Sequence, residues 1–135
     1  DNFHPLNSHV IPSLIRKFHY ADSEVVECWG DGTPLREFMY VDDFADACLL
    51  AMNSKIKNGE HLNVGSGEEV SIRSLAEMIS KITNFSGKII WDKSKPNGTP
   101  KRSLDYSRIL DIGWKPKYKL NDGLIKLYEW FKVNF

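Results

Sequence analysis

Long apolar runs, cysteine and an excess of either charge are all scarce in this sequence of 135 residues. No apolar run approaches the roughly 18 residues that a membrane-spanning helix needs. The first residues lack the basic and apolar regions of a signal peptide and an initiator methionine, so the chain reads as if it starts inside a longer protein. Eighteen basic residues balance eighteen acidic ones, which argues against a broad binding surface for nucleic acid or membranes. We therefore expect any anionic ligand to be small and held locally.

Only two cysteines occur, Cys28 in a strand-like run and Cys48 in a helix-like run. Neither has a CxxC partner or a metal-ligand spacing, so no metal site is expected. We expect both thiols to be buried and the protein to work in a reducing compartment, the cytoplasm. The content of 41% hydrophobic and 27% charged residues is ordinary for a globular protein, and the length fits one domain, residues 1–135.

Complete signatures of several enzyme classes are also missing. Gly65-Ser-Gly67 follows a predicted strand, as in a dinucleotide-binding turn, but Val70 stands where a third glycine or an alanine is needed. We therefore expect a tight turn there. Tyr128 and Lys132 have the Tyr-x-x-x-Lys spacing of short-chain dehydrogenases, yet Tyr128 lies on the apolar face of the last predicted helix, which favours core packing. Serine-hydrolase and zinc-protease motifs do not occur.

Apolar periodicity predicts alternating strands and helices, and hence an α/β or α+β fold without internal repeats. The predicted strands are residues 25–29, 36–41, 61–64 and 87–91. The predicted helices begin at Ser8, at Asp42 or Asp43, at Ser71, at Tyr106 and at Asn121 or Asp122. Asp43 and Asp46 resemble a capping box, and residues 55–59 resemble a polar linker.

The stretch 29–43 combines a strand end, a Gly/Pro turn and a second strand that carries Arg36. Gly30 and Gly32 allow backbone angles that other residues avoid, and Pro34 stiffens the exit of the turn. These features predict a turn that holds Arg36 at a fixed position near the beginning of a strand. Two interpretations stay open at this point, a hairpin with a solvated arginine or an arginine that binds an anion.

Two further groups of side chains could bind an anionic ligand. Val10, Leu14 and Lys17 recur along one side of the first predicted helix and place a cation beyond two apolar groups. The stripe could hold a base and a phosphate, or it could be a core edge with a solvated lysine. Similarly, the cations of segment 92–102 could clamp a diphosphate or face solvent. His9 could act as an acid or base, or simply cap the helix.

Four blocks of the sequence together resemble the GDP-L-fucose synthase family of extended short-chain dehydrogenases/reductases. The blocks are residues 2–12, 29–43, 63–67 and 94–100. The resemblance implies a homodimeric, NADPH-dependent enzyme that epimerises GDP-4-keto-6-deoxy-mannose at C3 and C5 and then reduces C4. It also implies that this chain is the carboxy-terminal, substrate-binding domain, and that the Rossmann domain with the main cofactor site lies outside these residues.

The resemblance assigns roles to eight residues. His9 is implied to exchange protons during epimerisation and to lie near the nicotinamide. The residues implied to contact the GDP part are Val10, Leu14, Lys17, Trp29, Arg36, Asn97 and Arg102. Lys17 and Asn97 stand where arginine and aspartate are common in the family, and Arg102 where lysine is common. Because lysine lacks the bidentate fork of arginine, the phosphate geometry at Lys17 is expected to differ.

We therefore expect the GDP-sugar-binding part of a GDP-L-fucose synthase, without turnover by the chain alone. Neither Cys28 nor Cys48 matches the catalytic cysteine that the resemblance places in the other half of the enzyme. One alternative is another sugar-nucleotide epimerase or dehydratase, which a preference for UDP-sugars would favour. A second alternative is a nucleotide-sugar-binding module without catalysis.

Overall fold

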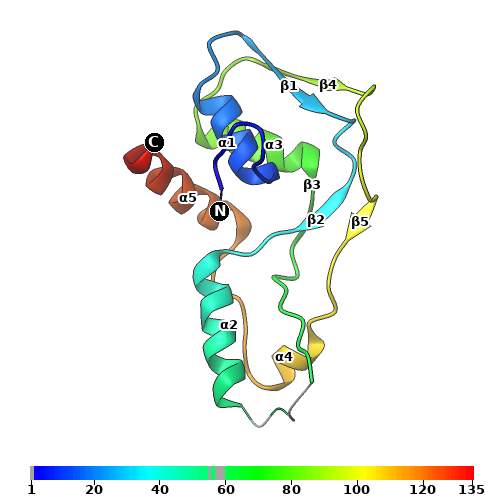
Figure 1. The fold of residues 1–135 in the computed structure, drawn as a ribbon, viewed down its shortest axis with the longest axis vertical. Coiled ribbons are helices and arrows are strands. Elements are labelled where there is room, and N and C mark those ends of the chain that lie inside the picture. The colour runs from blue at the N-terminus through cyan, green and yellow to red at the C-terminus, as the bar shows by residue number, and fades with distance from the viewer. Residues whose placement is uncertain (1, 55, 57–59) are drawn as a thin grey trace.

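The protein is described by a computed structural model that covers residues 2–54, 56 and 60–135. Its elements are α1 (Val10–His19), β1 (Val25–Trp29), β2 (Leu35–Glu37), α2 (Val41–Asn53), β3 (Glu69–Ser71), α3 (Ile72–Ile82), β4 (Lys88–Asp92), β5 (Lys101–Arg102), α4 (Ser107–Asp111) and α5 (Leu120–Asn134). The α/β prediction is confirmed (Figure 1). The linker predicted at 55–59 falls almost entirely outside the described residues.

Two small sheets occur in place of the hairpin that one of the two interpretations of residues 29–43 implied. β1 pairs in parallel with β4, whereas β2 lies between antiparallel β3 and parallel β5 (Figure 1). The turn at Gly30 and Gly32, both with φ of 76°, therefore carries the chain from one sheet to the other. The prediction that the second strand extends from Arg36 to Val41 is wrong, because the chain leaves β2 after Glu37 and α2 already begins at Val41.

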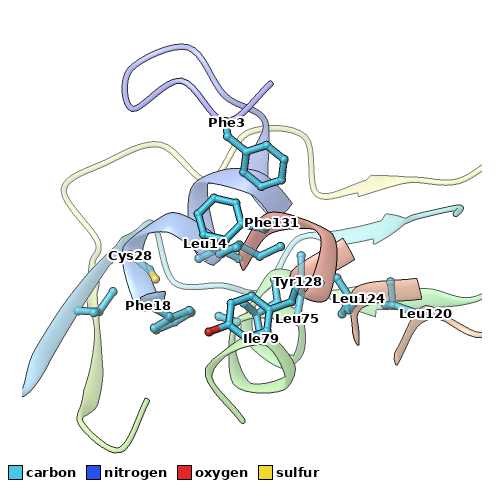
Figure 2. Close-up of a cluster of buried hydrophobic side chains, with 13 residues drawn as sticks. Phe3, Leu14, Phe18, Cys28, Leu75, Ile79, Leu120, Leu124, Tyr128 and Phe131 are labelled. Carbon is cyan, nitrogen blue, oxygen red and sulfur yellow. The ribbon is translucent and has the colours of Figure 1, made fainter. Parts of the chain in front are cut away.

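The main core lies where α1, α3 and α5 meet (Figure 2). Helical spacing brings apolar side chains from each helix together, and the largest of those that are fully buried are Ile15, Leu75, Ile79 and Phe131. Tyr128 belongs to this core and is 8% exposed. Its hydroxyl oxygen lies 2.9 Å from Nδ1 of His19. Core packing of Tyr128 is thus confirmed, and its spacing to Lys132 is not evidence for a reducing pair.

A second cluster joins α2 to α4 and to the segment before α5. Ala47, Ile109 and Trp114 are buried there. The predicted capping box is wrong, because the buried carboxylate of Asp43 accepts hydrogen bonds from the backbone amides of Lys117 and Tyr118, at 3.0 to 3.1 Å. This long-range contact fixes α2 against the chain that leads into α5.

Several predicted boundaries depend on contacts that a local pattern does not contain. Ser8 is not the cap of α1, since the helix begins one residue after His9, whose carbonyl accepts from the amide of Ser13. α5 begins at Leu120, before both predicted caps, because Glu68 accepts a hydrogen bond from the Leu120 amide at 3.1 Å. By contrast, the Ser71 hydroxyl accepts from the amide of Ser74, which confirms the predicted cap of α3.

The prediction of a strand at 61–64 is also wrong. Leu62 and Val64 pack against the second cluster, and the strand of this region comes later, at β3. Gly67 has a φ of 74° and its amide donates to Glu37, as expected of a tight turn. Cys28 is buried as predicted, whereas Cys48 is exposed on α2. No helix within the described ranges is long and apolar enough to cross a membrane.

Candidate functional site

A cavity of about 370 Å³ lies between α1 and the ends of β1 and β4. Its lining includes four of the predicted substrate residues, Val10, Leu14, Lys17 and Trp29. Leu14 is buried in the wall, whereas the ring of Trp29 is 62% exposed at the end of β1. A flat aromatic surface beside aliphatic side chains is suited to a nucleobase or another planar group. The helical stripe inferred from the sequence therefore faces a cavity and not the main core alone.

The ammonium group of Lys17 is held at the edge of this cavity. It donates a hydrogen bond to the backbone carbonyl of Glu27 at 2.8 Å, so its charge is fixed beside β1. The neighbouring thiol of Cys28 also lines the cavity. Burial raises the pKa of Cys28, and the Lys17 charge opposes that rise only in part. The thiol therefore stays protonated near neutral pH, and Cys28 serves as part of the wall and not as a nucleophile.

Arg36 and Arg102 form a second group, on neighbouring strands. They are directly paired in the parallel register of β2 and β5, which places their side chains on the same face of the sheet. Arg36 is half-buried and donates from Nη1 to the Leu35 carbonyl at 2.7 Å. Both arginines line a cavity of about 180 Å³. Two guanidinium groups on one face suit a diphosphate, since each can form bidentate bonds with phosphate oxygens.

Glu37 adjoins these arginines but is engaged elsewhere. Its carboxylate accepts from the Gly67 amide at 2.7 Å and from the Leu104 amide at 3.2 Å. The negative charge is thus used to hold the loops at each side of β2. This leaves the two guanidinium groups as the charged side chains suited to an anion at this cavity.

Asn97 lies in the exposed segment between β4 and β5. Its side-chain oxygen accepts a hydrogen bond from the backbone amide of Asp31 at 2.8 Å. The structure thus places Asn97 against the turn that connects Trp29 with Arg36, and its predicted contact with a nucleotide stays a prediction. Nearby, the ammonium of Lys95 lies 5.8 Å from the centre of the Trp29 ring.

His9 is exposed and precedes α1, directly before Val10. It is not among the described residues that line either cavity, so its predicted catalytic and cofactor roles also stay predictions. Within the described part of the chain, no three His, Cys, Asp or Glu side chains form a group that could hold a metal ion.

Ile72 and Trp91 also line the larger cavity, and the sequence did not indicate either one as a site residue. Trp91 is paired with Cys28 across the two parallel strands, and the guanidinium of Arg73 lies 4.7 Å from its ring centre. The position of Trp91 follows from pairing between strands that are far apart in the sequence. The one signal in the sequence that could have indicated Trp91 is its position: like Trp29, it is an aromatic residue at the end of a predicted strand.

The hydrogen bonds of Asp31, in the turn beside this cavity, lead to a prediction about the effect of pH on stability. Asp31 accepts from the Thr33 hydroxyl at 2.6 Å and from the Thr33 amide at 2.9 Å, and these bonds, with Asn97, lower its pKa from 3.8 to about 2. Because the folded pKa is depressed, the contribution of Asp31 to stability is present above 3.8 and is lost as the pH falls toward about 2. In Thr33→Val, we expect the pKa of Asp31 to move up toward 3.8.

The titration of the Asp31 carboxyl can be followed by NMR in both proteins. Ser94→Ala is the matched control, because the Ser94 hydroxyl bonds to Asp92 in the same way at 2.6 Å. That control should raise the pKa of Asp92 and leave the pKa of Asp31 in place. An Asp31 pKa that is the same in Thr33→Val and in the wild type would contradict the assigned cause.

Comparison with known proteins identifies the family that this chain resembles. Residues 1–65 match the model of the NAD dependent epimerase/dehydratase family. The chain is 50% identical over 137 aligned residues to putative GDP-L-fucose synthase 2 of Arabidopsis thaliana, covering 99% of this chain and 42% of that protein. It is 44% identical to GDP-L-fucose synthase of Escherichia coli, covering 99% of this chain and 45% of that protein. It thus spans less than half the length of these relatives.

Solved structures give the same result for the fold. A GDP-6-OMe-4-keto-L-xylo-heptose reductase from C. jejuni matches with a TM-score of 0.88 and 31% identity over 99% of this chain and 50% of that one. A GDP-L-fucose synthetase from Naegleria fowleri matches with a TM-score of 0.87 and 28% identity over 99% of this chain and 42% of that one. The resemblance seen in the sequence is confirmed: residues 1–65 match the NAD dependent epimerase/dehydratase family, and almost the whole chain is similar to part of the GDP-L-fucose synthases.

Proposed function

We propose that this chain is the GDP-sugar-binding domain, residues 1–135, of a GDP-L-fucose synthase. The observation that carries the proposal is the single cavity lined by Val10, Leu14, Lys17 and Trp29. These residues come from two elements, α1 and β1, and the family resemblance implies contact with GDP for each of them. The proposal is supported by the 44% to 51% identity to several GDP-L-fucose synthases over almost the whole chain.

In the proposed complex, the base lies against Trp29 and the aliphatic wall, and the diphosphate meets Arg36 and Arg102. Stacking on an aromatic ring is favourable for any base, and the aliphatic groups exclude water from it. The net charge of the chain is zero, so attraction for a diphosphate must come from local cations. Arg36 is the stronger candidate, because it is half-buried while Arg102 is exposed.

His9 is the proposed acid and base of epimerisation. Protons at C3 and C5 of the sugar are acidic because both carbons neighbour the C4 carbonyl, so a neutral imidazole can remove a proton, or imidazolium can donate one, on the face of the sugar that it lies against. Inversion needs a second acid or base on the opposite face, which is the role proposed for the cysteine that the resemblance places in the other half of the enzyme. When bound, NADPH supplies hydride for reduction at C4. This cofactor is held mainly by a Rossmann domain outside the present residues, with His9 near the nicotinamide.

The exposed face of α2 is the proposed contact with that cofactor domain. Val41, Phe44, Leu49 and Met52 are 52% to 81% exposed on this helix, although its opposite face packs against the second cluster. A helix that is apolar on both faces is usually covered on both. We also propose that the complete enzyme is a homodimer, as the family resemblance implies.

Calorimetry with the 135-residue chain tests the proposed ligand. We expect GDP to bind, weakly because one wall of the complete site would be missing, and UDP to bind at least about tenfold more weakly. A preference for UDP would favour the alternative of another sugar-nucleotide enzyme. We expect no conversion of GDP-4-keto-6-deoxy-mannose with NADPH by the isolated chain, and formation of GDP-fucose would overturn that expectation.

A further inference from the structure

The segment between β4 and β5 touches both ends of the candidate site. Lys95 lies over the ring of Trp29, at 5.8 Å from its centre. Three residues later, a Cβ added to Gly98 would lie 3.6 Å from Nη2 of Arg36. Asn97 lies between these two points in the sequence. Its side chain contacts the turn at 30–33, which joins Trp29 to the strand of Arg36.

The contact between Asn97 and this turn is close. The amide of Asp31 donates to Oδ1 of Asn97 at 2.8 Å. A Cβ on Gly30 would collide with the same oxygen, so the side chain of Asn97 fills the space that glycine leaves at this position. The φ of 76° at Gly30 independently favours glycine. The turn and the Asn97 side chain are thus packed closely against each other.

Further hydrogen bonds make the turn rigid on its other sides. The Gly30 amide donates to the carbonyl of Asp92 at 2.9 Å, and the Leu35 amide donates to the carbonyl of Pro100 at 2.8 Å. Arg73 donates to the Asp31 carbonyl at 2.6 Å and lies against the ring of Trp91. Asn97 lies between Asp92 and Pro100 in the sequence, and its side chain adds a third hydrogen bond from this segment to the turn.

We infer that Asn97 is a positioning residue that locks the turn at 30–33 against the segment 92–102, and so fixes Trp29 relative to Arg36. Its oxygen is the group that acts, because it accepts the Asp31 amide. The effect of this role on ligand binding rests on the proposed function, whereas its effect on the turn does not. The role also differs from direct contact with a nucleotide, which would not require the Asp31 bond.

Amide hydrogen exchange in the ligand-free chain tests the lock. Asn97→Ala removes the acceptor, and we expect exchange at the Asp31 amide to become about tenfold faster. Asn97→Asp retains an acceptor oxygen and should stay within about twofold of the wild type. Lys93→Ala, at an exposed position in the same segment, is the matched control. The Ser74 amide at the start of α3 should not change in any variant.

The affinity for GDP gives the second measurement. We expect Asn97→Ala to bind GDP about tenfold more weakly and Asn97→Asp to restore binding, because the lock prepares the site in advance. The inference is overturned if Asp31 exchange is unchanged in Asn97→Ala, whether or not GDP affinity falls. It is equally overturned if exchange rises equally at Ser74, or if it rises only at Asp31 while GDP binds as in the wild type.

Failure of the proposed function gives a different pattern. If the wild type does not bind GDP, the indole NMR signal of Trp29 in the ligand-free chain decides the role of Asn97. A shift of that signal in Asn97→Ala, but not in Lys93→Ala or Asn97→Asp, supports the positioning role. An unchanged signal overturns it.

Discussion

Replacing Asp43 with alanine is expected to lower the free energy of unfolding by about 3–5 kcal/mol. The carboxylate is 1% exposed and accepts from the amides of Lys117 and Tyr118 at 3.0 to 3.1 Å. Without it, two amides lose a charged acceptor in a part-buried location, and α2 keeps its apolar contact with Trp114 and the Lys117–Asp46 ion pair as its remaining connections to the segment before α5. Urea unfolding followed by circular dichroism measures the change.

Two variants separate this connection from other effects. Asp42→Ala removes a neighbouring carboxylate that is exposed, and should change the unfolding free energy by less than about 0.5 kcal/mol. Asp43→Asn keeps one acceptor oxygen and should lie between Asp43→Ala and the wild type. If Asp43→Ala were as stable as Asp42→Ala, the connection would not contribute to the fold.

Replacing Arg36 with alanine is expected to weaken GDP binding by about 30- to 150-fold, or about 2–3 kcal/mol. Arg36 is half-buried, so its bonds to phosphate oxygens would be less screened than those of a surface cation. The Arg102 side chain alone cannot replace it, because Arg102 is exposed. Calorimetric titration with GDP gives the affinity, and titration with guanosine shows whether the loss concerns the diphosphate.

Matched variants make the Arg36 result specific. Arg36→Lys keeps the charge without the bidentate fork and should recover only part of the affinity. Arg108→Ala removes an arginine of α4 that forms an ion pair with Glu60 at 2.8 Å, and this variant should leave GDP binding unchanged. Equal losses for guanosine and GDP in Arg36→Ala would place Arg36 away from the phosphates.

Elements that depend on neighbouring residues were predictable from the sequence. The strand at Val25–Trp29 was predicted with both of its ends, because valine and tryptophan favour strands and a Gly-containing turn follows directly. The Ser71 cap was predictable because a hydroxyl acts within three residues of its own position. The stripe of Val10, Leu14 and Lys17 follows from helix geometry in the same way, and all three residues line one cavity.

Contacts between distant residues were not predictable. Nothing near Asp43 in the sequence indicates that its partners lie more than 70 residues away. The beginning of α5 depends likewise on Glu68, which comes from the loop before β3. The strand predicted at 61–64 has the right composition but packs as part of a cluster, since β2 pairs with β3 and β5.

The same difference between local and long-range contacts applies to the candidate site. Trp29 and Arg36 could be identified individually, but the pairing of Arg36 with Arg102 depends on the register of two strands far apart in the sequence. Trp91 enters the cavity through a parallel pairing of β1 with β4. A single sequence contains no record of these registers, so neither the pairing of the two arginines nor the place of Trp91 in the cavity could be predicted.

The central claim is that the cavity at Trp29 and the pair formed by Arg36 and Arg102 are one nucleotide site. NMR mapping of GDP binding on the labelled 135-residue chain tests this claim most directly. We predict that GDP shifts the indole signal of Trp29, the methyl signals of Val10 and Leu14 and the guanidinium signal of Arg36 with a single dissociation constant. Shifts confined to the cavity between α2 and the segment around Trp114, or no shifts at any of these four residues, would contradict the account.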